Sequence, residues 1–537
     1  MIQDFSINFQ KNLQYQKKHR IFARSKGSVA QLNRASDYGS EGWGFESLRS
    51  HQSTKSVYNH VNAFFVSFYC LYKIFFTIFA KFKLLIIMRM KTLNGNRRTF
   101  LSNVAYGALG TISVPAILGS CSGSASKDVK LREVVVPEIR DKAPEGKPLK
   151  AGLVGCGDRG TGAAIDFISA GNGLQITAIG DLFQEKLNVS RALLKEKGQN
   201  IPDEKCFVGF DAYKKVIESG VDVVLLCTPP VFRPEHFEYA INAGKDCFIE
   251  KPVAVDPVGA RKVLLVGKQA VQKKLSVISG TVWRSSKGSI EAYKRVVGGA
   301  IGQLVSANVT RYGGTGWHKT REKGWSDMEY MLRNWINFTW VSGDLLCEQF
   351  IHEIDLMSWF YGDKPPVLAR ATGGRARRVT GNVYDFFSVQ YEYEDGFRAN
   401  CTSRQINGCD NLNEVIIYGT KGWANCRGGA GEIFNLDGTT AWKFESNGDD
   451  GLDNAYIQEH IRLVSAIRTG KPVVEVEEQV LSTVLGIMGR EAAYTGKFIT
   501  YNEIMASSQK LGPDTYEFGP VPNVVEQIEL PGVAVRV

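Results

Sequence analysis

Three glycines between an apolar stretch and a helical pattern constrain the fold of this 537-residue chain more than any other feature. They follow residues 149–154 and open an amphipathic pattern that runs to about residue 170. Such glycines let the chain turn tightly, let the backbone approach a pyrophosphate, and let helix and strand pack closely. The sequence therefore predicts a dinucleotide-binding loop. Its expected cofactor-binding residues are Gly155, Gly157, Asp158, Arg159 and Gly160.

A carboxylate follows the next predicted strand. The apolar stretch 174–180 ends at Asp181, 24 residues after Gly157. At this place a carboxylate can accept hydrogen bonds from an adenosine ribose, which favours NAD over NADP. The alternative is that Asp181 only caps the helix that follows it. We predict that the cofactor is NAD, with NADP as the open alternative.

The alternation of strands and helices continues through residue 255. Residues 221–227 and 246–249 are typical of buried parallel strands, and a helical pattern at 234–243 separates them. Ligands bind beyond the carboxyl ends of such strands, so the two turns there belong to the cofactor site. A lysine is costly to bury in a core, but at the strand's mouth it would lie beside the nicotinamide. Further cofactor-binding candidates are Cys227, Thr228, Pro229, His236, Glu250, Lys251 and Arg284.

The pattern changes after this point. Residues 304–313 and 386–405 alternate apolar and polar side chains, as half-buried antiparallel strands do. The sequence predicts the α/β class. We expect an N-terminal Rossmann dinucleotide-binding domain at 149–282 and a C-terminal α+β domain at 283–505 with an open, mostly antiparallel sheet. Residues 506–537 form a C-terminal tail.

One predicted helix of the second domain carries a row of ionisable side chains. In the stretch 343–362, Glu348, His352 and Asp355 are spaced i, i+4 and i+7, on one helical face. Three such groups are expensive to hold together unless they face water, a partner or a site. Two alternatives are a divalent metal site, for which the residue types are suitable, and a solvated polar stripe. We expect no metal.

Together these features resemble the Gfo/Idh/MocA oxidoreductase family over roughly residues 149–505. The motifs that carry the resemblance are the glycine loop, the acid after the second strand, Cys-Thr-Pro-Pro, Glu-Lys-Pro and the later His-x-x-Asp. The resemblance implies that Lys251 contacts the nicotinamide and the substrate hydroxyl, and that His352 takes the hydroxyl proton. The usual partner one turn earlier is aspartate, so Glu348 departs from the pattern. We assign catalysis to Lys251, His352 and Glu348.

The implied reaction is hydride transfer between a sugar carbon and the nicotinamide. Aromatic faces and guanidinium groups suit polyols, so several such residues are candidates for the substrate wall, although structural packing explains most of them equally well. The substrate-binding candidates are Tyr312, Trp317, Trp335, Asp355 and Arg404.

The first 148 residues indicate export. Residues 27–51 resemble a translated transfer-RNA gene, so we expect residues 1–87 to be a mis-annotated upstream extension or a disordered one, with a true start at Met88 or Met90. The rival interpretation is a genuine N-terminal anchor. Residues 88–121 contain Asn-Arg-Arg-Thr-Phe-Leu, an apolar run and Leu-Gly-Ser-Cys, which is typical of a twin-arginine lipoprotein signal. Cys121 would be lipidated, and 122–148 would be a linker.

Export by the twin-arginine route predicts a periplasmic, membrane-anchored lipoprotein that is already folded and loaded with cofactor. No free NAD pool is expected there, so the cofactor should be tightly bound and regenerated within each cycle. An oxidoreductase that uses two sugars, as in the glucose–fructose oxidoreductase branch, meets this requirement. The alternative is a glycosidase acting by transient oxidation and elimination, like the NAD-dependent α-N-acetylgalactosaminidases. A non-catalytic saccharide-binding lipoprotein is the third hypothesis.

Composition excludes other partners. The net charge of +10 comes almost entirely from residues 1–90, which hold 13 Lys and Arg against 4 Asp and Glu. The body of the protein is nearly neutral, so we expect no nucleic-acid partner. The ten cysteines show no metal-finger spacing, although Cys401 and Cys409 could pair. Membrane contact is expected only through the lipid. The family resemblance implies a homo-oligomer formed through the open face of the sheet.

Overall fold

The computed structural model describes residues 136–445, 451–522, 528 and 530–532. The expected extension at 1–87, the export signal at 88–121 and the lipidation site Cys121 lie outside the described residues. Within those ranges, no helix combines the length and the apolar character needed to span a bilayer.

The first sheet has six parallel strands in the order β3-β2-β1-β4-β5-β6. Chain order reverses at β1, where the sheet has the switch point of a doubly wound fold. The predicted Rossmann domain is therefore confirmed. The strands are β1 (Leu149–Val154), β2 (Leu174–Asp181), β3 (Cys206–Val208), β4 (Val223–Leu226), β5 (Asp246–Ile249) and β6 (Val277–Ser279).

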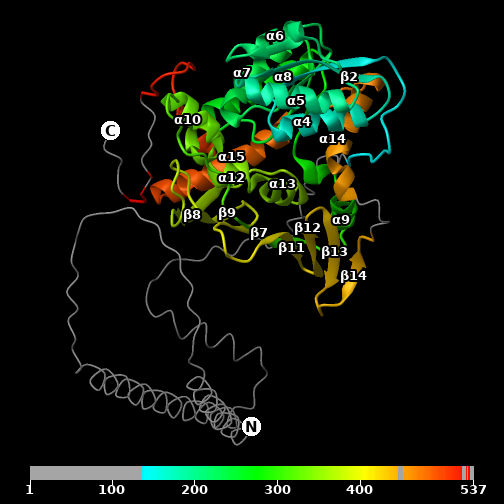
Figure 1. Cartoon of the computed structure of the whole chain (residues 1–537). Helices are drawn as coiled ribbons and strands as arrows, with labels where there is room; N and C mark the ends of the chain where they lie inside the picture. Colours follow the sequence, from blue (N-terminus) through cyan, green and yellow to red (C-terminus); the bar gives the residue numbers. More distant parts are fainter. Residues whose placement is uncertain (1–135, 446–450, 523–527, 529, 533–537) are drawn as a thin grey trace, which may run out of the picture. The chain divides into compact units, whose positions relative to one another are not determined.

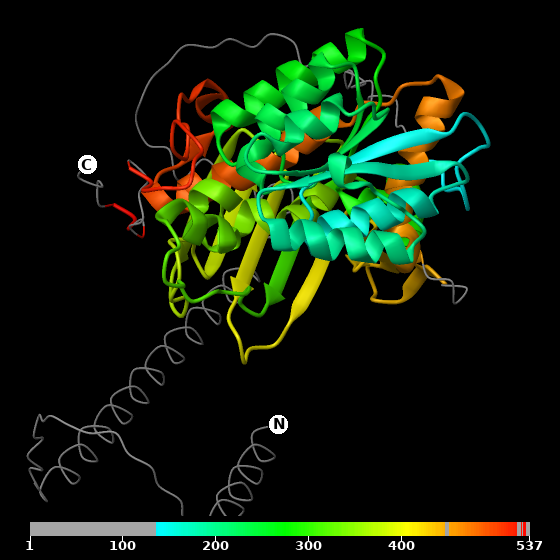
Figure 2. The same ribbon diagram turned by 45° about the horizontal axis from the view of Figure 1, so that its top comes forward.

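Helices cover both faces of this sheet and bury a separate core on each (Figure 2). On one face lie α6 (Ala212–Glu218), α7 (Arg233–Asn242) and α8 (Pro257–Gln272). On the other lie α4 (Asp158–Ser169), α5 (Gln184–Glu196) and α14 (Gly451–Thr469). Helix α14 comes from beyond the second sheet, so the chain returns to complete the first domain.

The second sheet has nine strands in the order β14-β13-β12-β11-β7-β10-β9-β8-β15. Neighbours are antiparallel except β7 and β10, which run parallel, so the sheet is mostly antiparallel as predicted. The strands are β7 (Leu304–Gly313), β8 (Leu368–Gly374), β9 (Phe386–Glu392), β10 (Arg398–Gln405), β11 (Leu412–Gly419), β12 (Gly422–Arg427), β13 (Ala430–Asn435), β14 (Thr440–Lys443) and β15 (Ile499–Thr500).

A layer of helices lies between the two sheets (Figure 1). Helix α15 joins them directly: the hydroxyl of Tyr391 in β9 donates to the carbonyl oxygen of Leu485 (2.6 Å), and Val476 packs against Gly267 of α8. The layer consists of α12 (Asp344–Glu348), α13 (Ile351–Phe360) and α15 (Val476–Thr495). Beside it lie α9 (Lys287–Val297), α10 (Asp327–Arg333), α11 (Thr339–Ser342) and α16 (Tyr501–Ala506).

The expected linker is not a free tether over its described half. The amide of Ala143 donates to the carbonyl oxygen of Ala170 (2.8 Å), and Ala143 is buried in the core of the first domain. Arg468 of α14 donates to the carbonyl oxygen of Pro144 (2.8 Å), which attaches the same segment from the other side. The cysteines described by the structure are free thiols, including Cys401 and Cys409, which therefore do not pair.

Candidate active site

The glycine loop between β1 and α4 leaves room for a ligand at only one of its glycines. A Cβ on Gly155, whose φ is +98°, would stand 2.7 Å from the backbone of Cys227 and Thr228. A Cβ on Gly160 would stand 1.8 Å from the carbonyl oxygen of Gly155. A Cβ on Gly157 would meet nothing within 4 Å. The protein's own packing requires the outer two glycines, whereas Gly157 borders open space beside a helix N-terminus, which fits a pyrophosphate.

Asp181, the last residue of β2, supports this loop. One carboxylate oxygen accepts from the amide of Cys156 (2.6 Å) and the other from the amide of Phe183 (2.8 Å). Burial raises the pKa of Asp181, and these backbone bonds oppose that rise. The N-cap of α5 is Phe183, so Asp181 is not that helix's cap. Asp158 is exposed on the first turn of α4.

The turn after β4 is held by a buried histidine. His236 lies 3.3 Å from the hydroxyl of Thr228 through Nδ1 and stacks on Tyr213 with ring centroids 3.9 Å apart. Burial, together with the nearby charge of Arg233, lowers the pKa of His236 to about 3, so the ring is neutral. Burial raises the pKa of the Cys227 thiol to about 12, which leaves it unreactive.

An ion pair ties the glycine loop to the turn after β5. Arg159 donates through Nε to Oε1 of Glu250 (2.7 Å), and Glu250 is only 3% exposed. The other oxygen of Glu250 accepts from the amide of Lys251 (3.1 Å). Burial of Glu250 is thus compensated by Arg159, and the pair holds Lys251 at the mouth of β5.

The Lys251 side chain reaches across to the second domain. Its Nζ donates to the backbone carbonyl of Glu348 and to Glu348 Oε1 (3.1 Å), and both side chains are nearly buried. The predicted single helix over 343–362 is broken here: α12 ends at Glu348 and α13 begins at Ile351. At the break the amide of Phe350 donates to Leu345, five residues earlier (2.9 Å). The break frees the Glu348 carbonyl for Lys251.

His352, on the first turn of α13, is half-buried next to this pair. Burial, followed by the charges of Lys251, Arg311 and Arg159, lowers the pKa of His352 well below its usual value. Its Nδ1 atom is enclosed and has no hydrogen-bond partner in the part of the chain that the structure describes. A neutral imidazole beside a lysine ammonium can accept a proton from a hydroxyl that the lysine binds.

Arg311 is a site residue that the sequence did not indicate. From β7 it donates to Glu353 Oε1 (2.7 Å) and to Gln349 Oε1 (3.1 Å). Gln349 in turn donates to Glu348 Oε2 (2.5 Å), so a continuous polar chain runs from Lys251 to Arg311. The signal was present in the alternation of β7, where Ala307, Val309 and Arg311 share the face that packs on α13.

The structure places Tyr312 and Arg404 away from the expected substrate wall. They are paired neighbours on β7 and β10, with the Arg404 guanidinium 4.6 Å from the Tyr312 ring centroid. Successive strand residues point to opposite faces, so both side chains lie on the sheet face turned away from α13. Of these two neighbours on β7, Arg311 rather than Tyr312 contacts the polar chain that leads to Lys251.

Asp355 and Arg284 also have different partners from those expected. Arg284 donates to both carboxylate oxygens of Asp355 (2.8 Å each) and to Asp363. Ser482 of α15 donates to the same Asp355 carboxylate (2.7 Å), which is 1% exposed. All four residues of this buried cluster lie in the second domain, in α13, before and after it in the chain, and on α15. Among the described residues, no three His, Cys, Asp or Glu side chains group so as to hold a metal ion.

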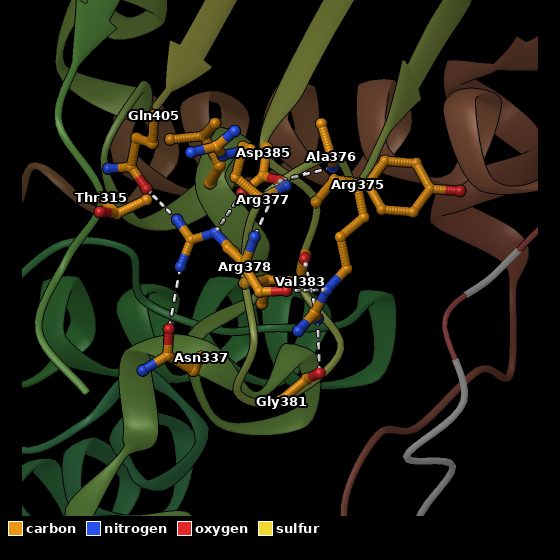
Figure 3. A network of polar contacts seen from close by, with 12 residues as sticks. Thr315, Asn337, Arg375, Ala376, Arg377, Arg378, Gly381, Val383, Asp385 and Gln405 are labelled. Carbon is orange, nitrogen blue, oxygen red and sulfur yellow. Dashed lines mark hydrogen bonds and ion pairs between the residues drawn. The ribbon is translucent and has the colours of Figure 1, made fainter. Parts of the chain in front are cut away.

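Trp317 and Trp335 contact each other edge-to-face, with centroids 5.7 Å apart, and Trp317 is 46% exposed. The side-chain Nδ2 of Asn337 donates to the Trp317 carbonyl oxygen (2.9 Å). Asn337 also accepts from Arg378 (2.9 Å), which pairs with the fully buried Asp385 (Figure 3). This network connects the tryptophan segment to the loop between β8 and β9.

Comparisons with known proteins agree with this geometry. The model described as "Oxidoreductase family, NAD-binding Rossmann fold" matches residues 149–278, and the "GFO/IDH/MocA C-terminal domain" matches 290–425. Inositol 2-dehydrogenase of Rhizobium meliloti is 24% identical over 262 residues, 48% of this chain and 73% of that protein. A glycosyl hydrolase family 109 protein of Shewanella baltica is 26% identical over 164 residues, 30% of this chain and 34% of that protein.

A solved structure shares the fold. The crystal structure of aldose–aldose oxidoreductase from Caulobacter crescentus, complexed with glycerol, aligns with a TM-score of 0.54 at 20% sequence identity. The alignment covers 66% of this chain and 99% of that one. Both domains of the present chain therefore have counterparts in a known two-domain architecture.

Proposed function

Because this chain belongs to the GFO/IDH/MocA family of NAD-binding oxidoreductases, we propose that it transfers hydride between a sugar or glycoside hydroxyl carbon and a tightly held nicotinamide cofactor. We propose NAD as the cofactor in preference to NADP, because Asp181 presents a carboxylate at the end of β2. The observation that carries the proposal is the placement of Lys251 at the mouth of β5, bound to Glu348 and next to a neutral His352.

The residues divide the reaction between them. When bound, the nicotinamide accepts or returns the hydride. His352 accepts the hydroxyl proton as general base, a role worth about 10²–10⁴-fold in rate. Lys251 donates a hydrogen bond to the same oxygen and stabilises the negative charge that develops on it. Glu348 is a positioning residue, since its carboxylate and carbonyl hold the lysine Nζ in place.

We propose that the mature protein is a periplasmic lipoprotein, exported by the twin-arginine route and anchored through Cys121. The Arg-Arg pair, the apolar run and the cysteine support this proposal. In that compartment a dissociable cofactor would be lost, so each oxidation must be followed by a reduction at the same site. We also propose a homo-oligomer, because the outward face of the second sheet exposes Phe386 (41%).

The second candidate is a glycosidase that oxidises its substrate transiently, eliminates the glycosidic substituent and reduces the product. The similarity to glycosyl hydrolase family 109 proteins favours it. It requires an additional base for the carbon–hydrogen bond next to the oxidised carbon.

One experiment separates the two. The protein is mixed with single sugars, and absorbance at 340 nm is followed before and after a second sugar is added; chromogenic glycosides are tested in parallel. The oxidoreductase gives a rise at 340 nm that the second sugar reverses, without chromophore release. Chromophore release without a lasting rise would select the glycosidase, and no response to any sugar or glycoside would overturn both.

A further inference from the structure

The C-terminal tail, residues 507–522, lies across one edge of the Rossmann domain and contacts both domains (tail in red beside α10, Figure 1). The amide of Leu511 donates to Oδ2 of Asp256, the N-cap residue of α8 (2.8 Å). Further along, the carbonyl oxygen of Gly519 accepts from the amide of Met328 in α10 (3.1 Å). Backbone bonds at both ends hold the tail on this path.

Between these two attachments the tail presents aromatic side chains to the Rossmann domain. Phe518 packs against Phe183 and Phe210, with ring centroids 6.2 Å and 5.2 Å away. Phe183 lies two residues after Asp181, and Phe210 lies in the loop after β3. Both therefore belong to the turns at the carboxyl ends of the strands.

Tyr516 makes similar aromatic contacts at the turn after β4. Its ring contacts Phe232, in the turn after β4, at 4.9 Å between centroids, and stacks on Trp340 of α11 at 6.4 Å. The tail bridges this edge without filling it, because a cavity of about 500 Å³ remains, lined in part by Phe210, Phe232 and Tyr516.

Helix α10 supports the same region from the second domain. The Arg333 guanidinium lies 4.0 Å from the centroid of the Phe183 ring and forms an ion pair with Glu185. Met328 and Leu332 are buried in the cluster that this helix forms with the tail and with Phe183. The turn that follows Asp181 is thus covered by two segments from outside the Rossmann domain.

The position of the tail has a direct consequence for a dinucleotide. In a doubly wound sheet the adenosine half lies at the carboxyl ends of the strands, next to the carboxylate after β2. The turns after β2, β3 and β4 are the ones that the tail covers. A dinucleotide held at this edge has the tail as its outer wall, and its adenosine half must pass that wall to leave.

We propose that residues 507–522 form the adenosine-side wall of the dinucleotide site and retain the cofactor through turnover, with Tyr516 and Phe518 as the contacts that hold the wall closed. This inference rests on the proposed function and gives it a structural cause, since a cycle that oxidises and then reduces at one site needs a cofactor that stays bound.

The test measures release of the cofactor rather than activity alone. Full-length wild-type protein and the variants Phe518→Ala and Tyr516→Ala are loaded with NADH, and the fluorescence of the bound dinucleotide is followed after addition of excess NAD. The control is Phe498→Ala. Phe498 is a 65% exposed phenylalanine whose ring lies 5.2 Å from the guanidinium of Arg370 in β8. Thermal unfolding of the cofactor-free proteins verifies that each variant is folded.

We expect both tail variants to release NADH about three- to tenfold faster than wild type, as loss of an aromatic contact implies, while the control is unchanged. Release at the wild-type rate from both folded tail variants would overturn the proposal. If the wild-type protein binds NADH but releases it as fast as the variants do, only the proposed role of the tail is refuted. If the wild-type protein binds no dinucleotide, the proposed function is refuted as well.

Discussion

The central glycine of the loop offers a substitution that separates cofactor binding from folding. Gly157 has φ −72° and ψ −178°, which any L-residue adopts, and a Cβ there meets no atom within 4 Å. Alanine reduces the entropy of the unfolded chain, which stabilises by about 0.4–1 kcal/mol. Alanine is a poorer N-cap than glycine, and this loss offsets the gain. We therefore expect Gly157→Ala to change the unfolding free energy by less than about 0.5 kcal/mol.

The same methyl group projects into the space that a pyrophosphate would occupy. We expect Gly157→Ala to weaken NAD binding at least tenfold, about 1.4 kcal/mol. The measurements are thermal unfolding of the cofactor-free protein and NAD titration by calorimetry. Gly162→Ala, on the same helix and with only an ordinary contact to Arg159 (3.7 Å), is the matched control and should leave binding unchanged.

Gly155→Ala provides the opposite case. With φ +98° and backbone atoms 2.7 Å from the new Cβ, it should destabilise the cofactor-free fold by more than about 1–2 kcal/mol. The reasoning is refuted if Gly157→Ala binds NAD as tightly as wild type. It is equally refuted if Gly157→Ala loses as much stability as Gly155→Ala.

Three further predictions concern the reacting groups and the buried Arg284–Asp355 ion pair. His352→Asn should lower the rate of hydride transfer about 10²–10⁴-fold while NAD stays bound, as single-turnover absorbance at 340 nm will report. His352 must be neutral to act as a base, and burial and the charge of Lys251 lower its pKa, so kcat/KM should fall only below about pH 6.5. Arg311→Gln removes a nearby cation, which raises the pKa of His352 and should move the acidic limb of the pH profile to higher pH. An acidic limb that does not move would contradict the assignment of His352 as the base. Arg284→Met leaves Asp355 buried without its ionic partner and should cost about 3–5 kcal/mol in urea denaturation, whereas a loss below about 1 kcal/mol would show that the pair is dispensable.

The parallel sheet and the position of Lys251 were predictable because their signals are local. Buried parallel strands have uninterrupted apolar runs, and each is followed by a turn whose place at the ligand edge is set by the fold. Lys251 lies two residues after the end of β5, so its location at the mouth of the strand required no knowledge of distant contacts.

The residues on the substrate side were harder to predict. Alternating side chains in a strand define two faces, but the alternation does not show which face the helices cover. A shift of one residue exchanges the faces, and this is the difference between Tyr312 and Arg311. Asp355 shares a helical period with Glu348 and His352, but its partner Arg284 is 71 residues away in sequence. The break in the helix after Glu348 further separates groups that an unbroken helix would align.

The tail was unpredictable for a related reason. Residues 507–522 contain no periodic pattern, so the sequence does not show whether Tyr516 and Phe518 pack against the protein or lie in an exposed segment. Their partners Phe210 and Phe232 lie some 300 residues earlier in the chain. Only the folded structure brings these aromatic side chains to one edge.

The central claim is that this chain holds a nicotinamide dinucleotide through a closed redox cycle. The most direct test is mass spectrometry of the small molecules released when the purified protein is denatured. The account predicts NAD or NADH in close to one equivalent per chain. Protein that releases no dinucleotide and binds neither added NAD nor NADP would contradict it, and the non-catalytic saccharide-binding lipoprotein would then be the better hypothesis.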